Sequence, residues 1–119
     1  MGMKHYYKAS DGYIKLLNQS YDLDLWNIDI IELVIPDGCV DVECSDNKLK
    51  ELIIPNSCVE FFCSNNQLKE LIIPDNCKYI SCESNQLKEL IIPDGRVWVW
   101  SDMKSITELN KVENLILCI

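Results

Sequence analysis

Histidine, glycine and basic residues are scarce in this chain of 119 residues, and each scarcity argues against a class of function. The one histidine, His5, stands among tyrosines, with no framed serine or cysteine that could form a nucleophilic dyad with it. The four glycines lie singly and form no glycine-rich phosphate loop. Ordered carboxylate clusters are also missing. We therefore expect a protein that is not an enzyme and that holds no cofactor.

Positive charge and long apolar runs are in deficit as well. The chain has 11 Lys and Arg against 19 Asp and Glu, with a net charge of -8. Because nucleic-acid binding draws on clustered Lys and Arg, we expect no direct binding to DNA or RNA. No apolar run approaches the roughly 18 residues of a membrane span, and the N-terminus lacks the apolar stretch of a signal peptide. The sequence favours a cytoplasmic protein without membrane contact.

Cysteine is abundant by contrast. Seven cysteines, an odd number, fit poorly with a closed disulfide framework, and a cytosolic compartment keeps thiols reduced. The composition, 48% apolar and 25% charged, is that of a single folded domain. The cysteines therefore need an explanation other than disulfides.

Internal repetition supplies that explanation. The segments 33–51, 52–70, 71–89 and 90–108 align at a period of 19 residues, and the heptapeptide LKELIIP recurs unchanged at positions 49, 68 and 87. A fixed period near this length predicts a solenoid in which each coil buries its inner face on the next coil.

Within each period, the residues fit the pattern L-x-x-L-x-L-x-x-N-x-L. The first full match places Cys39, Val42, Cys44, Asn47 and Leu49 in this frame, and the two following coils repeat it. The chain thereby resembles the leucine-rich repeats. Its repeat sequence is most similar to the short repeats of bacterial effector and related bacterial or large-virus proteins. The resemblance implies a binding scaffold, in host-cell cytoplasm if the origin is of that kind. It does not carry over the ubiquitin-ligase activity of some effectors, because no second domain follows.

The predicted fold is mainly β: a leucine-rich-repeat solenoid of five to six short coils, with one parallel sheet on the concave face and little or no convex helix. Residues 20–119 form the solenoid with a C-terminal capping strand, and residues 1–19 form an N-terminal cap containing a short helix within 10–19. LKELIIP predicts a second extended run, which ends at proline. The parallel strands are expected near 22–24, 41–43, 60–62, 79–81 and 98–100.

Strand alternation predicts that the framed cysteines and asparagines point inward. The cysteines then act as small core hydrophobes, and Asn47, Asn66 and Asn85 form a ladder that bonds backbone groups left unpaired by the turns. The thrice-repeated C-x4-C spacing comes close to that of zinc ligands. The core interpretation is favoured because Val, Leu or Ser replaces these cysteines in the flanking coils. Cys118, outside the frame, is either a reactive thiol or buried in the last strand.

Outward positions on the same strands are the candidate partner-binding site. This face grades from an acidic half into an aromatic half. The carboxylates could simply keep the face soluble, and a cap could cover the tryptophans, whereas exposed Trp and Tyr are typical interface anchors. The candidate residues are Asp22, Asp24, Asp41, Glu43, Glu60, Phe62, Tyr79, Ser81, Trp98 and Trp100.

Three hypotheses of function follow. The leading one is a protein-binding module whose partner has a basic surface. The alternative is an acidic inhibitor that mimics nucleic-acid charge and blocks a nucleic-acid-binding protein. The third is self-association through an apolar column on the second extended run. The sequence does not determine which residues of this run face outward, and a partly buried edge is favoured over an exposed apolar stripe. The members of that column are Val34, Ile53, Ile72 and Ile91.

Overall fold

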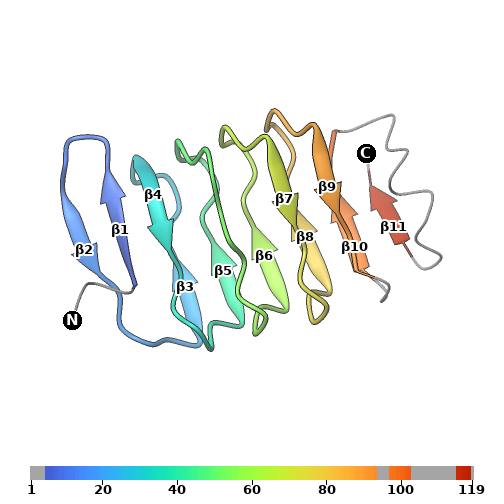
Figure 1. The fold of residues 1–119 in the computed structure, drawn as a ribbon, viewed down its shortest axis with the longest axis horizontal. Helices are drawn as coiled ribbons and strands as arrows, with labels where there is room; N and C mark the ends of the chain where they lie inside the picture. Colours follow the sequence, from blue (N-terminus) through green and yellow to red (C-terminus); the bar gives the residue numbers. More distant parts are fainter. Residues whose placement is uncertain (1–4, 94–96, 103–114, 119) are drawn as a thin grey trace.

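The computed structural model describes residues 5–93, 97–102 and 115–118, the last range as backbone only. These residues form strands and turns, and no helix is found among them, so none of the described segments is a helix long and apolar enough to cross a membrane. Figure 1 shows the strands in chain order. They are β1 (Tyr6–Ala9), β2 (Ile14–Leu16), β3 (Asp22–Asp24), β4 (Ile30–Val34), β5 (Asp41–Glu43), β6 (Glu60–Phe62), β7 (Glu70–Ile72), β8 (Tyr79–Ser81), β9 (Glu89–Ile91), β10 (Val97–Trp100) and β11 (Leu115–Cys118).

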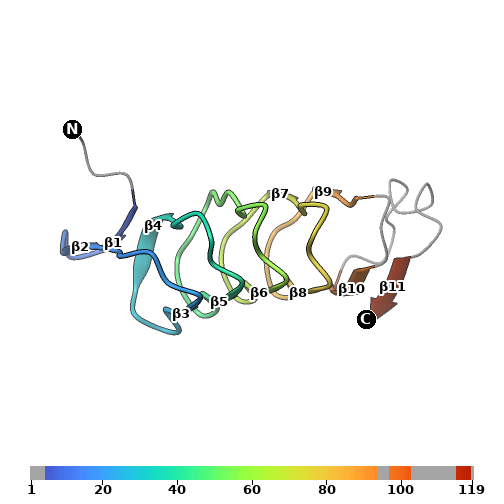
Figure 2. The same ribbon diagram turned by 90° about the horizontal axis from the view of Figure 1, so that it is seen from below.

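The main element is a parallel sheet of six strands in the order β11-β10-β8-β6-β5-β3. From β3 to β10 its register advances by one repeat per strand, so that Asp41 lies beside Glu60 and Glu60 lies beside Tyr79. About four turns of the chain stack into a solenoid in the described residues, against the five to six coils predicted. The predicted mainly β solenoid with one parallel sheet and all five predicted strand positions are confirmed. Figure 2 shows this sheet along one side of the coils and β4, β7 and β9 along the other.

The core lies between these two sides. Side chains alternate along each strand, so Val42, Phe61 and Ile80 point inward with at most 1% of their surface exposed. The framed cysteines are free thiols stacked beside them in two columns, and each is at most 1% exposed. The prediction that they are core residues is confirmed. The side chain of Cys118 lies outside the described residues. The cysteine columns are Cys39, Cys58 and Cys77, and Cys44, Cys63 and Cys82.

The predicted asparagine ladder is also confirmed. The buried Asn66 amide donates to the carbonyls of Cys44, Cys63 and Ser64 at 3.1, 3.1 and 3.3 Å. Its side-chain oxygen accepts the backbone N–H of Leu49 at 2.9 Å. Each amide thus ties its own turn to the preceding coil. Equivalent bonds are made by Asn47 and Asn85.

The predicted N-terminal helix is wrong, because residues 6–16 form an antiparallel hairpin instead. Gly12 adopts a φ of 95° in the turn, where an L side chain would be strained. The hairpin continues onto the solenoid, since β1 pairs with β4 in a three-stranded sheet. Pairing with β4 satisfies backbone groups at the end of the stack that a helix would have left open.

The second extended run is a strand in three coils, namely β4, β7 and β9, and β7 pairs with β9 in parallel. Residues 51–53 have the same sequence as β7 and β9 but form no strand. The apolar column points outward, because Leu33, Leu71 and Leu90 of the same run lie in the core. The expectation of a partly buried edge fits the two ends of the column, which keep less than half of their surface exposed, and is wrong for its two middle members. We call this set the isoleucine column: Val34 (37% exposed), Ile53 (86%), Ile72 (62%) and Ile91 (46%).

Candidate functional site

The ten candidate residues all lie on the outward side of the six-stranded sheet, which we call the strand face. The alternation of each strand explains this, since the residues between them, such as Leu23, Val42 and Val99, point into the core or toward it. The parallel register then sets the candidates in two rows across neighbouring coils. One row runs Asp22, Asp41, Glu60, Tyr79, Trp98, and the other runs Asp24, Glu43, Phe62, Ser81, Trp100.

Three aromatic rings of the strand face form a continuous stack. The ring centroids of Tyr79 and Trp98 are 6.4 Å apart at an interplanar angle of 19°, because these residues pair in register. Trp98 and Trp100, two residues apart on β10, are separated by 6.1 Å at 20°. The three residues remain 40, 38 and 37% exposed, so their rings are not buried beneath a cap. The stack presents rigid apolar area to solvent.

The carboxylates at the other end of the strand face are crowded. Desolvation raises the pKa of Asp41, and the adjacent Asp22 raises it further through its charge and a hydrogen bond. Two other carboxylates are engaged by their own turns: Asp24 accepts the backbone N–H of Trp26 at 3.3 Å, and Glu43 accepts that of Ser45 at 2.7 Å. Such local bonds stabilise the turns that follow the strands. The acidic half therefore serves the fold as well as presenting charge.

This crowding predicts that Asp41→Asn stabilises the protein at neutral pH. The pKa of Asp41 is higher in the folded state than its ordinary value of 3.8, so ionisation of this group favours unfolding. Stability is regained as pH falls through the raised pKa, and the advantage of the variant should vanish below about pH 3. Thermal unfolding at both pH values checks this. Glu51→Gln, an exposed carboxylate on the other side of the coils, is the control, and an equal gain there would contradict the prediction.

Several polar residues of the turns extend the site beyond what the strands alone predicted. Glu83 accepts a hydrogen bond of 2.5 Å from the hydroxyl of Ser81. Asp46 accepts one of 2.7 Å from the indole Nε1 of Trp26, which is 54% exposed. Both acids lie just past the outward strand positions, at adjacent positions of the 19-residue period, since Asp46 aligns with Ser84 and Glu83 aligns with Ser45. They add negative charge along one edge of the strand face.

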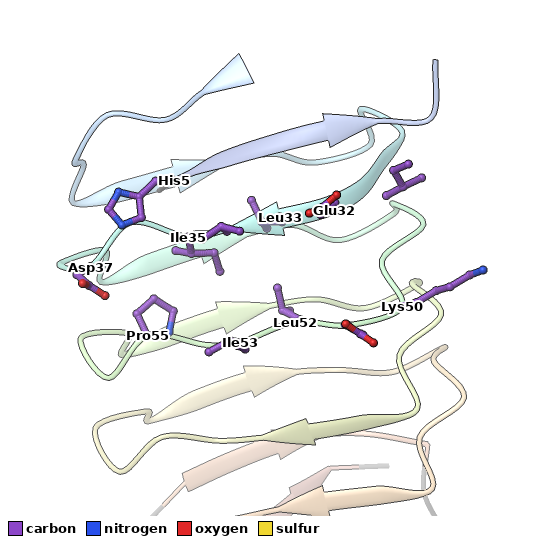
Figure 3. Close-up of a pocket in the computed structure, with 12 residues that line it drawn as sticks. His5, Glu32, Leu33, Ile35, Asp37, Lys50, Leu52, Ile53 and Pro55 are labelled. Atoms are coloured by element: carbon purple, nitrogen blue, oxygen red, sulfur yellow. The ribbon is translucent and has the colours of Figure 1, made fainter. Parts of the chain in front are cut away.

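His5 lies on a different part of the surface. A hollow of about 650 Å³ opens beside β4 and residues 50–55. Figure 3 shows His5, Asp37 and Pro55 at one end of it, with Glu32 and Lys50 at the other. No serine or cysteine lines this hollow, and no group of three or more metal-ligating side chains is found in the part of the chain that the structure describes.

Comparisons with protein-family models, curated proteins and solved structures give no match. The resemblance to leucine-rich repeats therefore stays a prediction from the framed residues of the sequence.

Proposed function

We propose that this chain is a non-enzymatic protein-binding module of leucine-rich-repeat type, whose strand face binds a partner with a basic surface. The observation that carries the proposal is the exposed stack of Tyr79, Trp98 and Trp100 on the same face as a row of carboxylates. Stacked rings held by a sheet lose little conformational entropy on binding, and Trp and Tyr are the side chains enriched at interface hot spots.

The two halves of the strand face have different roles in this proposal. The carboxylates attract a basic surface over about a Debye length, roughly 8 to 10 Å at physiological ionic strength, and so raise the association rate. The aromatic stack provides the desolvated contact that slows dissociation. An arginine of the partner fits both halves, because its guanidinium pairs with carboxylates and stacks on aromatic rings.

The alternative function, an acidic mimic of nucleic acid, is supported by the carboxylate pair Asp22 and Asp41, whose close approach resembles a line of fixed negative charges. In that case the carboxylates would supply the binding energy, and affinity would fall steeply with salt. The aromatic residues would be dispensable. The two proposals thus differ in which half of the strand face holds the partner.

Alanine variants of the tryptophans distinguish these functions. With a partner isolated by affinity capture from the native host, Trp98→Ala or Trp100→Ala should weaken binding by about 2 kcal/mol or more, mainly through faster dissociation. Glu60→Gln should mostly slow association at low salt. Surface-exchange kinetics measure both rates, and Tyr13→Ala on the N-terminal hairpin is the control. Normal binding by the tryptophan variants, with binding lost in the carboxylate variant, would replace the module by the mimic.

A further inference from the structure

We propose that the isoleucine column is a self-association surface that packs against the same column of a second copy of the chain. Its two middle side chains are among the most exposed apolar groups in the described residues, with Ile53 at 86% and Ile72 at 62%. They recur once per coil and so line up along the solenoid. Contiguous exposed apolar surface of this kind marks interaction sites.

One pair of opposite charges beside the column, in the coil of Ile72, favours a second copy as the occupant. Lys69 lies three residues before Ile72 and Asp75 lies three residues after it, and both are exposed. A two-fold axis parallel to the solenoid, passing between two facing columns, reverses the strand direction of the second copy. It thereby places Lys69 opposite Asp75 of the second copy, and the same contact occurs twice because a two-fold interface is self-complementary.

The other face-to-face arrangement is disfavoured by the same charges. A two-fold axis parallel to the strands would also bring the columns together, but it would set each column of residues against its own counterpart. The glutamates of the run, which share the outward parity of the isoleucines, would then face one another, and so would the lysines. Like charges held opposite one another weaken association. The glutamates are Glu32, Glu51, Glu70 and Glu89, and the lysines are Lys50, Lys69 and Lys88.

The expected dimer is weak and leaves the strand face free. Neighbouring coils are about 4.8 Å apart, so the column covers less than the roughly 800 Å² per partner of a standard interface. Figure 2 shows β7 and β9 on the side of the coils opposite the six-stranded sheet. A dimer formed through the isoleucine column would therefore present two strand faces pointing away from each other.

Sedimentation equilibrium of the full chain at concentrations up to about 1 mM tests the surface. We expect a monomer–dimer equilibrium that Ile53→Lys or Ile72→Lys weakens at least about tenfold. Both side chains are exposed, so neither substitution disturbs the core. Leu16→Lys, an exposed apolar residue on the hairpin, is the control and should leave the equilibrium unchanged. A chain that stays monomeric throughout, or a dimer indifferent to both isoleucine variants, would overturn the proposal.

Charge reversal tests the two-fold arrangement separately. Lys69→Asp alone opposes aspartate to aspartate twice, and Asp75→Lys alone opposes lysine to lysine twice, so each variant should be monomeric by itself. An equimolar mixture of the two restores both opposite-charge contacts and should dimerise. Failure of the mixture to dimerise would show that the proposed symmetry is wrong.

Discussion

Raising the pH above 9 should lower the free energy of unfolding of this protein far more steeply than the titration of its exposed groups alone would. The reason is the six buried thiols, whose pKa values lie above the ordinary value of 9.0 because burial disfavours the thiolate. For Cys77 the pKa rises to about 11, and for Cys58 and Cys82 to about 12. Desolvation is the largest cause for each.

The sign follows from proton binding. Above pH 9 the unfolded chain releases its thiol protons while the folded chain keeps them, so unfolding is favoured as pH rises. Each thiol then removes about 1.4 kcal/mol of stability per pH unit until its own folded-state pKa is reached. The five thiols with large shifts, acting together, approach the whole stability of a small domain, roughly 5 to 15 kcal/mol. We therefore expect a steep loss of stability above pH 9.

Urea unfolding measured from neutral pH to about pH 10.5 gives the slope directly. The matched variant is Cys82→Ala, which lowers stability at every pH through the cavity it leaves but should reduce the alkaline slope by about one proton. Exposed lysines and tyrosines contribute equally to both proteins and cancel. An unchanged slope in the variant would mean that the thiols are not the groups responsible.

Asn66→Ala should cost about 3 kcal/mol of unfolding free energy or more. The amide of Asn66 serves three carbonyls, and its oxygen accepts the N–H of Leu49, all at the buried turn between coils. Each buried backbone group left without a partner costs on the order of 1 to 3 kcal/mol. Urea unfolding measures the loss. Asn56→Ala, in an exposed turn, is the control, and a similar small effect from both variants would contradict a structural role for the ladder.

Asn66→Asp separates the donor from the acceptor. A carboxylate can still accept the N–H of Leu49, but it offers no donor to the three carbonyls and repels them. We expect a loss at neutral pH as large as that of the alanine variant. Because this environment raises the pKa of the introduced acid, stability should recover as pH falls below its folded-state pKa, when the protonated group again donates. Thermal unfolding at several pH values detects this recovery, and a flat profile would contradict it.

The sequence was sufficient to predict the six-stranded sheet because two independent patterns agree there. The 19-residue period sets the register, and polar and apolar residues alternate through each strand, as in Asp41, Val42 and Glu43. The inward cysteines and the asparagine ladder follow from the same frame. The outward candidates follow as well, since a residue between two buried positions of a strand has only one direction left.

The second run was harder to predict because its apolar residues are consecutive. Leu71, Ile72 and Ile73 carry no alternation, so the sequence does not say which of them faces water. Pairing decides it: β7 and β9 align with the leucines inward. Residues 51–53 show the limit of local sequence, because identical residues there form no strand beside the differently built first coil.

The N-terminal hairpin was missed although a signal was present. Asp11-Gly12 between apolar stretches is a typical hairpin turn, and Ile14-Lys15-Leu16 alternates as a strand does. A cap at Ser10 or Asp11, followed by apolar Ile14, Leu16 and Leu17, favoured a short helix when taken alone. The local sequence of the hairpin does not show that β1 pairs with β4, which lies more than 20 residues further along the chain.

The constant register of the main sheet has a consequence for how such a chain can grow. Because every strand from β3 to β8 meets its neighbour 19 residues away, a tandem duplication of one period would place each cysteine, asparagine and leucine in an existing column. The new coil would find neighbours of the right shape on both sides, with no change elsewhere in the chain. The end pieces would stay as they are, since the hairpin pairs with the first coil through β4. Unequal recombination between near-identical segments could therefore lengthen or shorten this protein in whole coils without loss of the fold.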